Sequence, residues 1–294
     1  MSTIPASPII PEPATQPVRR AVILAAGLGT RLQPITRVVP KEMLPIGRKP
    51  VLEHILDEVC AAGVTDLLFV ISREKALIGE YFGDGSNWGV RCATVIQPAM
   101  RGIADAVLRA EEWTCGDPFL LAFGDCMLTG PGDGPTRRLL AAHRAAGAAA
   151  TALCEEVPLA RTRHYGILVP DPDSEWAEGA PFRLSGMVEK PEPERSPSRW
   201  AVAARWALDR RVFPYLRCLQ PAANGETNLY QAVPTMISDG LPVWAAPLLR
   251  GEARRDTGRW KSYLVCAARA AAEDEEAGAE AVAAAVAARP AEGG

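Results

Sequence analysis

The sequence predicts an α/β fold in which a mixed, mainly parallel sheet is flanked by helices and followed by a C-terminal helical extension. Three observations lead to this prediction. Short apolar runs, typical of strands that are buried on both faces, recur along the first half of the chain. Segments with apolar residues at helical spacing separate these runs, as the crossovers of a parallel sheet require. With 294 residues, of which 48% are hydrophobic, the chain is long enough for one large domain or two small ones.

The predicted elements begin after a proline-rich segment. Residues 1–18 contain five prolines and almost no charge, and we expect them to form a disordered tail. A buried strand is predicted directly after the tail, over residues 21–26. Further strands are expected at residues 67–71, 92–96, 119–123 and 149–154, and helices at residues 51–59, 76–82, 103–113 and 137–146. This alternation is typical of parallel strands joined by helices.

The pattern changes after residue 156. Three predicted strands then follow one another with proline-rich loops between them, which indicates an antiparallel extension of the sheet. These strands lie at residues 166–169, 182–189 and 200–208. Residues 263–288 are rich in alanine and predict one or two helices. We therefore divide the chain into the tail, a domain over residues 19–250 and a C-terminal helical segment over residues 251–294.

Composition and charge exclude several classes of partner. The chain has 32 Lys and Arg against 35 Asp and Glu, so it lacks the concentrated positive charge that nucleic acid or an anionic membrane requires. It has no apolar stretch of about 18 residues and no secretory signal pattern. Its seven cysteines show no spacing typical of zinc ligands, and we expect free thiols in a reducing cytosol. We therefore predict a cytoplasmic protein with no nucleic-acid or membrane partner.

A glycine-rich loop follows the first strand. It has the sequence LAAGLGTRLQP from residue 24, and PKEMLP follows from residue 40. Glycines let backbone N–H groups approach phosphate oxygens, while Arg31 and Lys41 add positive charge. A dinucleotide fingerprint would need glycine where Leu32 stands, and the P-loop string is absent. We therefore predict a phosphate-binding loop of a third kind, the alternative being a glycine-rich turn with two solvated bases.

These two segments resemble the signature of sugar-1-phosphate nucleotidylyltransferases, and PKEMLP is most similar to the form in bacterial UTP–glucose-1-phosphate uridylyltransferases. Further motifs match in the same order over about residues 20–265. They are Gln97-Pro98 with Gly102, Gly124-Asp125, Tyr165-Gly166, Glu189-Lys190-Pro191, Gly225-Glu226 and Asp256-Thr257-Gly258. The resemblance implies that residues 19–250 form a Rossmann-like catalytic domain of the nucleotide-diphospho-sugar transferase type. It also implies transfer of a nucleotidyl group, first of all UMP from UTP, to a hexose 1-phosphate such as glucose 1-phosphate, with release of pyrophosphate.

The resemblance assigns the nucleotide to the glycine-rich loop. Arg31 and Lys41 would hold and activate the triphosphate. Gln97 and Gly102 would recognise the base, although Gln97 alone could equally be a polar loop residue. Backbone groups of Leu24 and Ala25 would hold the other side of the base. The implied nucleotide-binding set is Leu24, Ala25, Ala26, Gly27, Gly29, Thr30, Arg31, Lys41, Gln97 and Gly102.

The resemblance also implies a Mg²⁺ site. Asp125 lies at the carboxyl end of a predicted strand, which is the edge where open α/β sheets bind ligands. Asp125 and Asp256 would ligate the ion, so the segment 251–294 would complete the metal site, and it could also support a dimer or tetramer. Without the resemblance, Asp125 could bond to its own turn, and Asp256 could cap the helix that is predicted to follow it.

The sugar phosphate is assigned to the second half of the sheet. Glu189 would accept hydrogen bonds from sugar hydroxyls and Lys190 would pair with the sugar phosphate. Tyr165 and Gly166 belong to the same implied sugar-phosphate-binding set, and Gly166 would let the sugar approach the backbone. The implied catalytic set is Arg31, Lys41, Asp125 and Lys190.

Some positions depart from the uridylyl pattern. Arg199 stands where asparagine is usual and Ala204 where glycine is usual, both on the strand that lines the family's sugar pocket. Residues 102–106, GIADA, are in turn similar to the adenylyl branch. A dTTP-, ATP- or GTP-dependent transferase acting on another sugar or cyclitol 1-phosphate is therefore an alternative. An inactive nucleotide-sugar-binding regulator is a further one, although the catalytic set is complete.

Overall fold

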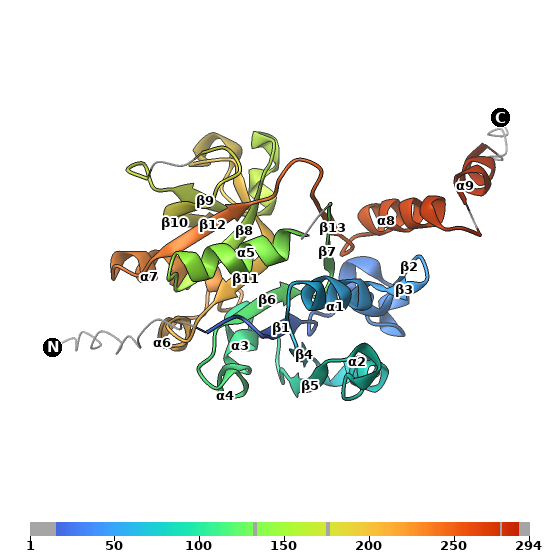
Figure 1. Cartoon of the computed structure of the whole chain (residues 1–294), viewed down its shortest axis with the longest axis horizontal. Helices are drawn as coiled ribbons and strands as arrows, with labels where there is room; N and C mark the ends of the chain where they lie inside the picture. Colours follow the sequence, from blue (N-terminus) through green and yellow to red (C-terminus); the bar gives the residue numbers. More distant parts are fainter. Residues whose placement is uncertain (1–15, 132–133, 175–176, 277, 288–294) are drawn as a thin grey trace.

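The computed structural model describes residues 16–131, 134–174, 177–276 and 278–287, and these confirm the mixed α/β architecture (Figure 1). Nine strands form one sheet. Its parallel part contains, in spatial order, β5 (Arg91–Ile96), β4 (Asp66–Ile71), β1 (Arg20–Leu24) and β6 (Phe119–Phe123). It continues through β11 (Trp200–Leu208), β8 (Ala150–Glu156), β12 (Val243–Pro247), β10 (Phe182–Glu189) and β9 (Gly166–Pro170). Strand β11 is antiparallel to both β6 and β8, so it separates the parallel part from the mixed extension.

Helices cover both faces of the sheet because the central strands are apolar on both faces. In β1, Val22 packs into one hydrophobic cluster, whereas Ala21 and Ile23 pack into the other. The first cluster includes residues of α3 (Ile103–Leu108), α6 (Val212–Cys218) and α7 (Leu229–Ser238). The second includes residues of α1 (Val51–Ala61), α2 (Ala76–Phe82), α5 (Gly134–Ala145) and α8 (Trp260–Glu273). The sheet is therefore the rigid platform whose edge positions the loops.

The structure differs from the sequence prediction at several boundaries, for example at β1, which was expected over residues 21–26. The helix expected at residues 103–113 is two helices, α3 and α4 (Glu111–Thr114). Asp256 does not cap a helix, because it ends strand β13 (Ala253–Asp256), and α8 begins at Trp260 with Arg259 as its N-cap. Val18, which the sequence analysis placed in the tail, is buried in the core. Residues 1–15 of that tail lie outside the described part of the chain.

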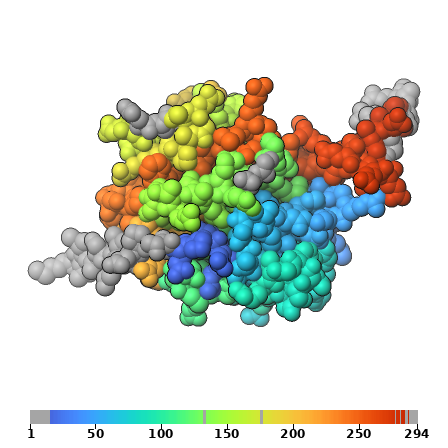
Figure 2. Space-filling view, in the orientation of Figure 1, coloured from blue at the N-terminus to red at the C-terminus, as the bar shows by residue number. Residues whose placement is uncertain are grey.

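Two small sheets complete the structure. Strand β13 pairs antiparallel with β7 (Cys126–Thr129), and β2 (Pro45–Ile46) pairs with β3 (Lys49–Pro50). Helix α8 packs on the body through Cys266, and α8 with α9 (Gly278–Ala287) projects to one side of the molecule as an arm (Figure 2). At the end of α8, Arg48 donates to the carboxylates of Asp274 and Glu276 at 2.7 and 2.6 Å. Among the described helices, none has the length and hydrophobicity needed to cross a bilayer.

Candidate active site

The carboxyl ends of the parallel strands meet at one edge of the sheet, and several predicted residues lie there. Residues 25–29 follow β1, Gln97 follows β5, and Gly124 and Asp125 follow β6. Backbone hydrogen bonds connect the strand ends at this edge. Ala25 N donates to Val70 O at 2.8 Å, and Gly124 N donates to Leu24 O at 2.9 Å. Such an edge is where open α/β sheets bind their ligands.

The glycine-rich loop offers a row of backbone donors. Within the described chain, the N–H groups of residues 26–29 have no hydrogen-bond acceptor. Gly29 has a φ of 67°, and its carbonyl accepts the Thr36 hydroxyl at 2.8 Å, which fixes the turn. Thr30 and Arg31 follow on an exposed 3-10 turn, and Arg31 forms no ion pair with any described residue. Successive free N–H groups beside an arginine favour an anion such as phosphate.

Lys41 joins this loop to Asp125. Its ammonium forms an ion pair with Asp125 Oδ2, and it lies 3.8 Å from where a Cβ on Gly27 would be. Burial lowers the pKa of Lys41, but Asp125, Glu42 and Asp256 raise it by more, so the net shift is upward. Burial likewise raises the pKa of Asp125, but Lys41 outweighs it and holds that pKa below its usual value. Both groups therefore stay charged at neutral pH.

The pairing of β13 with β7 brings Asp256 to the same place. Register sets Asp256 opposite Cys126, and Thr257 donates to Asp125 O from its backbone N at 2.9 Å and its hydroxyl at 2.8 Å. A Cβ on Gly258 would lie 3.0 Å from Asp256 Oδ1 and 3.2 Å from Asp125 Oδ2. The two carboxylates thus face a common point that only glycine leaves open.

These two carboxylates fit a divalent cation. Hard cations such as Mg²⁺ prefer oxygen ligands, and Mg²⁺ takes one or two carboxylates together with water and substrate phosphates. The described residues contain no group of three or more His, Cys, Asp or Glu arranged to hold a metal. A metal held here would consequently depend on Asp125 and Asp256 and on oxygens from the substrates.

The segment after β5 is folded onto a second loop. Gln97 Nε2 donates to Gly102 O at 3.0 Å and to Asp105 Oδ2 at 2.9 Å. Gly102 has a φ of 94°, and a Cβ on it would overlap the backbone of Thr227. Thr227 N donates to Arg101 O at 2.8 Å, so the loop containing Gly225 and Glu226 supports this segment.

A buried ion pair that sequence reasoning missed supports the first loop. Lys75 donates to Glu42 Oε2 and to Ala25 O, both at 2.7 Å. Burial raises the pKa of Glu42 and lowers that of Lys75. Ala25 N and O and Leu24 O therefore already have partners inside the protein, and their expected contact with a base remains a prediction. Only the presence of Glu42 within PKEMLP pointed toward this pair.

The four predicted sugar-site residues form a second group. Gly166 of β9 pairs with Glu189 of β10, and Lys190 N donates to Tyr165 O at 2.9 Å. A Cβ on Gly166 would overlap the Met187 methyl and lie 3.1 Å from Glu189 Oε2, so a larger residue there would require these two side chains to move. Lys190 Nζ pairs with Glu189 Oε1 at 2.7 Å. The EKP segment and the YG segment are thus one structural unit.

Arg254 connects the two groups, and no sequence motif indicated it. Its guanidinium lies 4.4 Å from the centre of the Tyr165 ring, and its Nε donates to Glu155 Oε1 at 2.6 Å. Asp256 lies two residues further along the same strand. Strand β13 therefore contacts the predicted sugar group through Arg254 and the predicted metal group through Asp256.

The two departures from the family pattern have separate structural consequences. Arg199 pairs with Glu156 Oε1 at 2.8 Å at the start of β11. Ala204 is buried and has a φ of 60°, a left-handed conformation that favours glycine. It lies where the register between β11 and β8 shifts. The expected effect of these two positions on acceptor choice remains a prediction.

We expect Ala204→Gly to raise the melting temperature by about 1–3 °C. Glycine relieves left-handed strain of about 1–2 kcal/mol, and the greater entropy of the unfolded chain offsets about half of that gain. Ala203→Gly is the matched control, since Ala203 is buried in the same strand without a positive φ, and it should lower the melting temperature. Equal destabilisation by both variants, measured by calorimetry, would contradict the strain.

Comparison with known proteins decides the family. The profile of the Nucleotidyl transferase family matches residues 20–273. The chain belongs to this family. It is 30% identical over 241 residues to UTP–glucose-1-phosphate uridylyltransferase 2 of Streptococcus pyogenes, which covers 74% of this chain and 80% of that relative. The protein is accordingly a nucleotidyltransferase enzyme.

Solved structures agree with this family membership. A UTP-bound UGPase from Acinetobacter baumannii has a TM-score of 0.80 at 25% identity, and the match covers 92% of this chain and 100% of the other. A UDP-glucose pyrophosphorylase complexed with UDP-glucose has a TM-score of 0.79 at 25% identity, covering 87% and 100%. The nucleotidyl transferase fold expected from the motifs is thereby confirmed.

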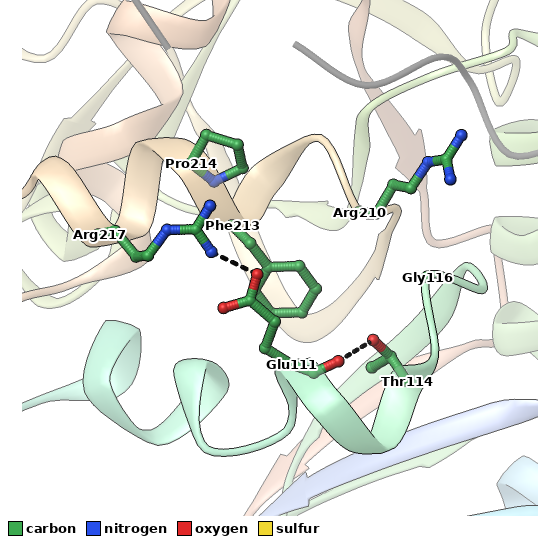
Figure 3. Close-up of a pocket in the computed structure, with 7 residues that line it drawn as sticks. All are labelled: Glu111, Thr114, Gly116, Arg210, Phe213, Pro214 and Arg217. Atoms are coloured by element: carbon green, nitrogen blue, oxygen red, sulfur yellow. Dashed lines mark hydrogen bonds and ion pairs between the residues drawn. The ribbon is translucent and has the colours of Figure 1, made fainter. Parts of the chain in front are cut away.

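The structure also has a cavity that is separate from this site. It has a volume of about 250 Å³ and lies between α4 and α6 (Figure 3). Its lining consists of Glu111, Thr114, Gly116, Arg210, Phe213, Pro214 and Arg217. Arg217 is paired with Glu111 across it. None of the residues that the family motifs identify lines this cavity.

Proposed function

We propose that this nucleotidyl transferase transfers UMP from UTP to glucose 1-phosphate, giving UDP-glucose and pyrophosphate. The observation that carries the proposal is the convergence of Asp125, Asp256 and Lys41 beside the free N–H groups of the loop at residues 26–29. The relatives support the choice of substrates, because their names specify UTP, glucose 1-phosphate or UDP-glucose.

The chemistry needs alignment and positive charge rather than a protein nucleophile. An oxygen of the sugar phosphate attacks the α-phosphorus of UTP, the bond from that phosphorus to the α–β bridging oxygen breaks, and pyrophosphate leaves. Arg31, Lys41 and the loop N–H groups would hold the triphosphate and the developing pyrophosphate charge. Lys190 would hold the sugar phosphate in line with the leaving group, while Glu189 would accept sugar hydroxyls.

We infer that Mg²⁺ is the cofactor and that Asp125 and Asp256 hold it. When bound, the ion neutralises phosphate charge and helps to orient the reacting groups. The ion pair with Lys41 keeps Asp125 ionised and thus ready for a cation. Because Thr257 donates twice to Asp125 O, the segment that contains Asp256 is held beside Asp125 by bonds within the protein.

A substrate panel tests the proposal. UTP, dTTP, ATP and GTP are each combined with glucose 1-phosphate, other hexose 1-phosphates and a cyclitol phosphate, and pyrophosphate release is followed. We expect the highest kcat/KM for UTP with glucose 1-phosphate. A higher value for another pair would correct the substrates. No release from any pair would contradict the proposed activity.

Lys190→Ala should raise the KM for the sugar phosphate by about tenfold to a hundredfold, because a charge-assisted hydrogen bond contributes about 1.5–3 kcal/mol. The KM for UTP should change by less than about threefold. Lys261→Ala, which removes an exposed lysine from α8, is the control. Steady-state kinetics in both substrates gives the comparison, and an equal rise in both KM values would remove Lys190 from the acceptor site.

We further propose that the protein is a cytoplasmic homo-oligomer, a dimer or a tetramer. Leu264 and Val265 on the projecting arm are 56% and 46% exposed, which supports burial against another copy. All seven cysteines are free thiols, which supports a reducing compartment. Light scattering of the purified protein would measure the mass of the assembly.

A further inference from the structure

The side-chain amide of Gln97 is held in one orientation. Gln97 is buried at the end of β5, and its Nε2 donates to Gly102 O at 3.0 Å and to Asp105 Oδ2 at 2.9 Å. A backbone carbonyl and a carboxylate can only accept hydrogen bonds, so the nitrogen, not the oxygen, must face them. Both N–H bonds of the amide are then used. Gln97 Oε1 has no hydrogen-bond partner in the part of the chain that the structure describes.

A hydrogen bond from Arg109 fixes the orientation of the Asp105 carboxylate. Asp105 is 8% exposed, and its other oxygen, Oδ1, accepts from Arg109 Nη2 at 2.5 Å. Arg109 is one turn further along, just past the end of α3. Gly102 is held by the Thr227 loop, since Ala104 N donates to Thr227 O at 3.0 Å. Hydrogen bonds thus run from Arg109 to Asp105 and from Gln97 to Asp105, and the amide cannot turn over without breaking them.

Gln97 is placed to meet a base at the nucleotide edge. Its backbone N donates to Ile71 O at 2.8 Å, at the end of the strand whose Val70 O accepts Ala25 N. Gln97 is therefore separated from the phosphate loop only by the end of β4. A free glutamine amide can present either a donor or an acceptor to a base, whereas this one presents only an acceptor.

We propose that Asp105 is a positioning residue that determines base specificity by holding Gln97 Oε1 toward the base. Uracil, thymine and guanine have a ring N–H at the centre of their pairing edge, whereas cytosine and adenine have a lone pair there. An acceptor at that point bonds the first group and repels the second. The proposal rests on the proposed function, because it takes the edge near Gln97 to be the nucleotide site.

Asp105→Asn tests the proposal with almost no change in shape. Arg109 can only donate, so in this variant it holds the oxygen of the introduced side-chain amide and turns the amide nitrogen toward Gln97. Two amide nitrogens cannot bond to each other, so only the bond to Gly102 O still holds the Gln97 amide in its orientation, and the amide becomes free to turn over and present Nε2 to the base. We expect the ratio of the Kd for CTP to the Kd for UTP, measured by calorimetry without sugar phosphate, to fall at least about tenfold.

Two further measurements complete the test. Glu112→Gln, which neutralises an exposed carboxylate on the neighbouring helix α4, should keep the wild-type ratio. Wild-type protein should bind N3-methyl-UTP at least about tenfold more weakly than UTP, because the methyl group removes the ring donor. This second measurement does not depend on the folding of any variant.

The outcomes separate the two proposals. Failure of the wild-type protein to bind UTP would overturn the proposed function, and this inference with it. If the wild-type protein binds UTP but also binds N3-methyl-UTP equally well, the inference alone is overturned. The same conclusion follows if folded Asp105→Asn keeps the wild-type ratio of CTP to UTP affinity.

Discussion

Asp125→Asn is expected to lower kcat by at least about a thousandfold while the fold is retained. The substitution removes one of the two carboxylates that face the common point beside Gly258, and it removes the charge partner of Lys41. Loss of a metal ligand costs several kcal/mol of transition-state stabilisation, and each 1.36 kcal/mol corresponds to about tenfold in rate. Pyrophosphate release is measured over a Mg²⁺ titration, and the melting temperature reports the fold.

Asp173→Asn is the control for this variant, since Asp173 is an exposed aspartate on the loop between β9 and β10. It should keep the wild-type rate and the wild-type dependence on Mg²⁺. If Asp125→Asn retained a rate within about tenfold of wild type, which is a loss of only about 1.4 kcal/mol, Asp125 would not be a metal ligand. Unfolding of Asp125→Asn would instead show that its ion pair is structural, and Asp256→Asn would then serve as the test of the metal site.

The sequence was sufficient for the parallel part of the sheet because that part is encoded locally. Strands β1, β4 and β6 are buried on both faces, so each is a continuous apolar run. Strand β13 could not be predicted, because its sequence ARRD has no apolar pattern and its pairing with β7 joins residues far apart in the chain. This pairing positions Asp256, which explains why sequence reasoning placed Asp256 at the start of a helix.

The candidate site could likewise be predicted only where it is encoded locally. Backbone donors in a glycine-rich loop follow from local sequence, whereas Arg254 and Lys75 reach the site only through tertiary packing. Ala204 is instructive in a different way. Its sequence position pointed to the sugar pocket, but a sequence does not display φ, and the structure shows a left-handed backbone at this alanine. Glycine at this position would relieve the strain of that conformation, and the effect of Ala204 on acceptor choice stays a prediction.

We expect Lys75→Met to lower the free energy of unfolding by about 3–5 kcal/mol, because it leaves a buried carboxylate without its partner. The side chains of Lys75 and Glu42 are 6% and 1% exposed, so water cannot replace the lost contact. Lys41 Nζ lies 4.0 Å from Glu42 Oε1 and is a second cation that lowers the pKa of Glu42. Denaturant unfolding measures the loss, and the turnover rate shows whether Lys41 has been drawn away from Asp125.

The double variant Lys75→Met with Glu42→Gln distinguishes charge from packing. If the uncompensated charge is the cause, neutralising Glu42 should restore most of the lost stability, because a buried amide costs less than a buried carboxylate.

The pH dependence of the stability loss in Lys75→Met gives a second criterion. Burial already raises the pKa of Glu42, and removing Lys75 takes away the main group that lowers it. A group with a raised pKa in the folded state stabilises at low pH and loses that contribution as pH rises, so the deficit of Lys75→Met should be larger near about pH 8 than near about pH 5. An equal deficit at both pH values, without rescue by Glu42→Gln, would show that Lys75 acts through its packing and its bond to Ala25 O alone.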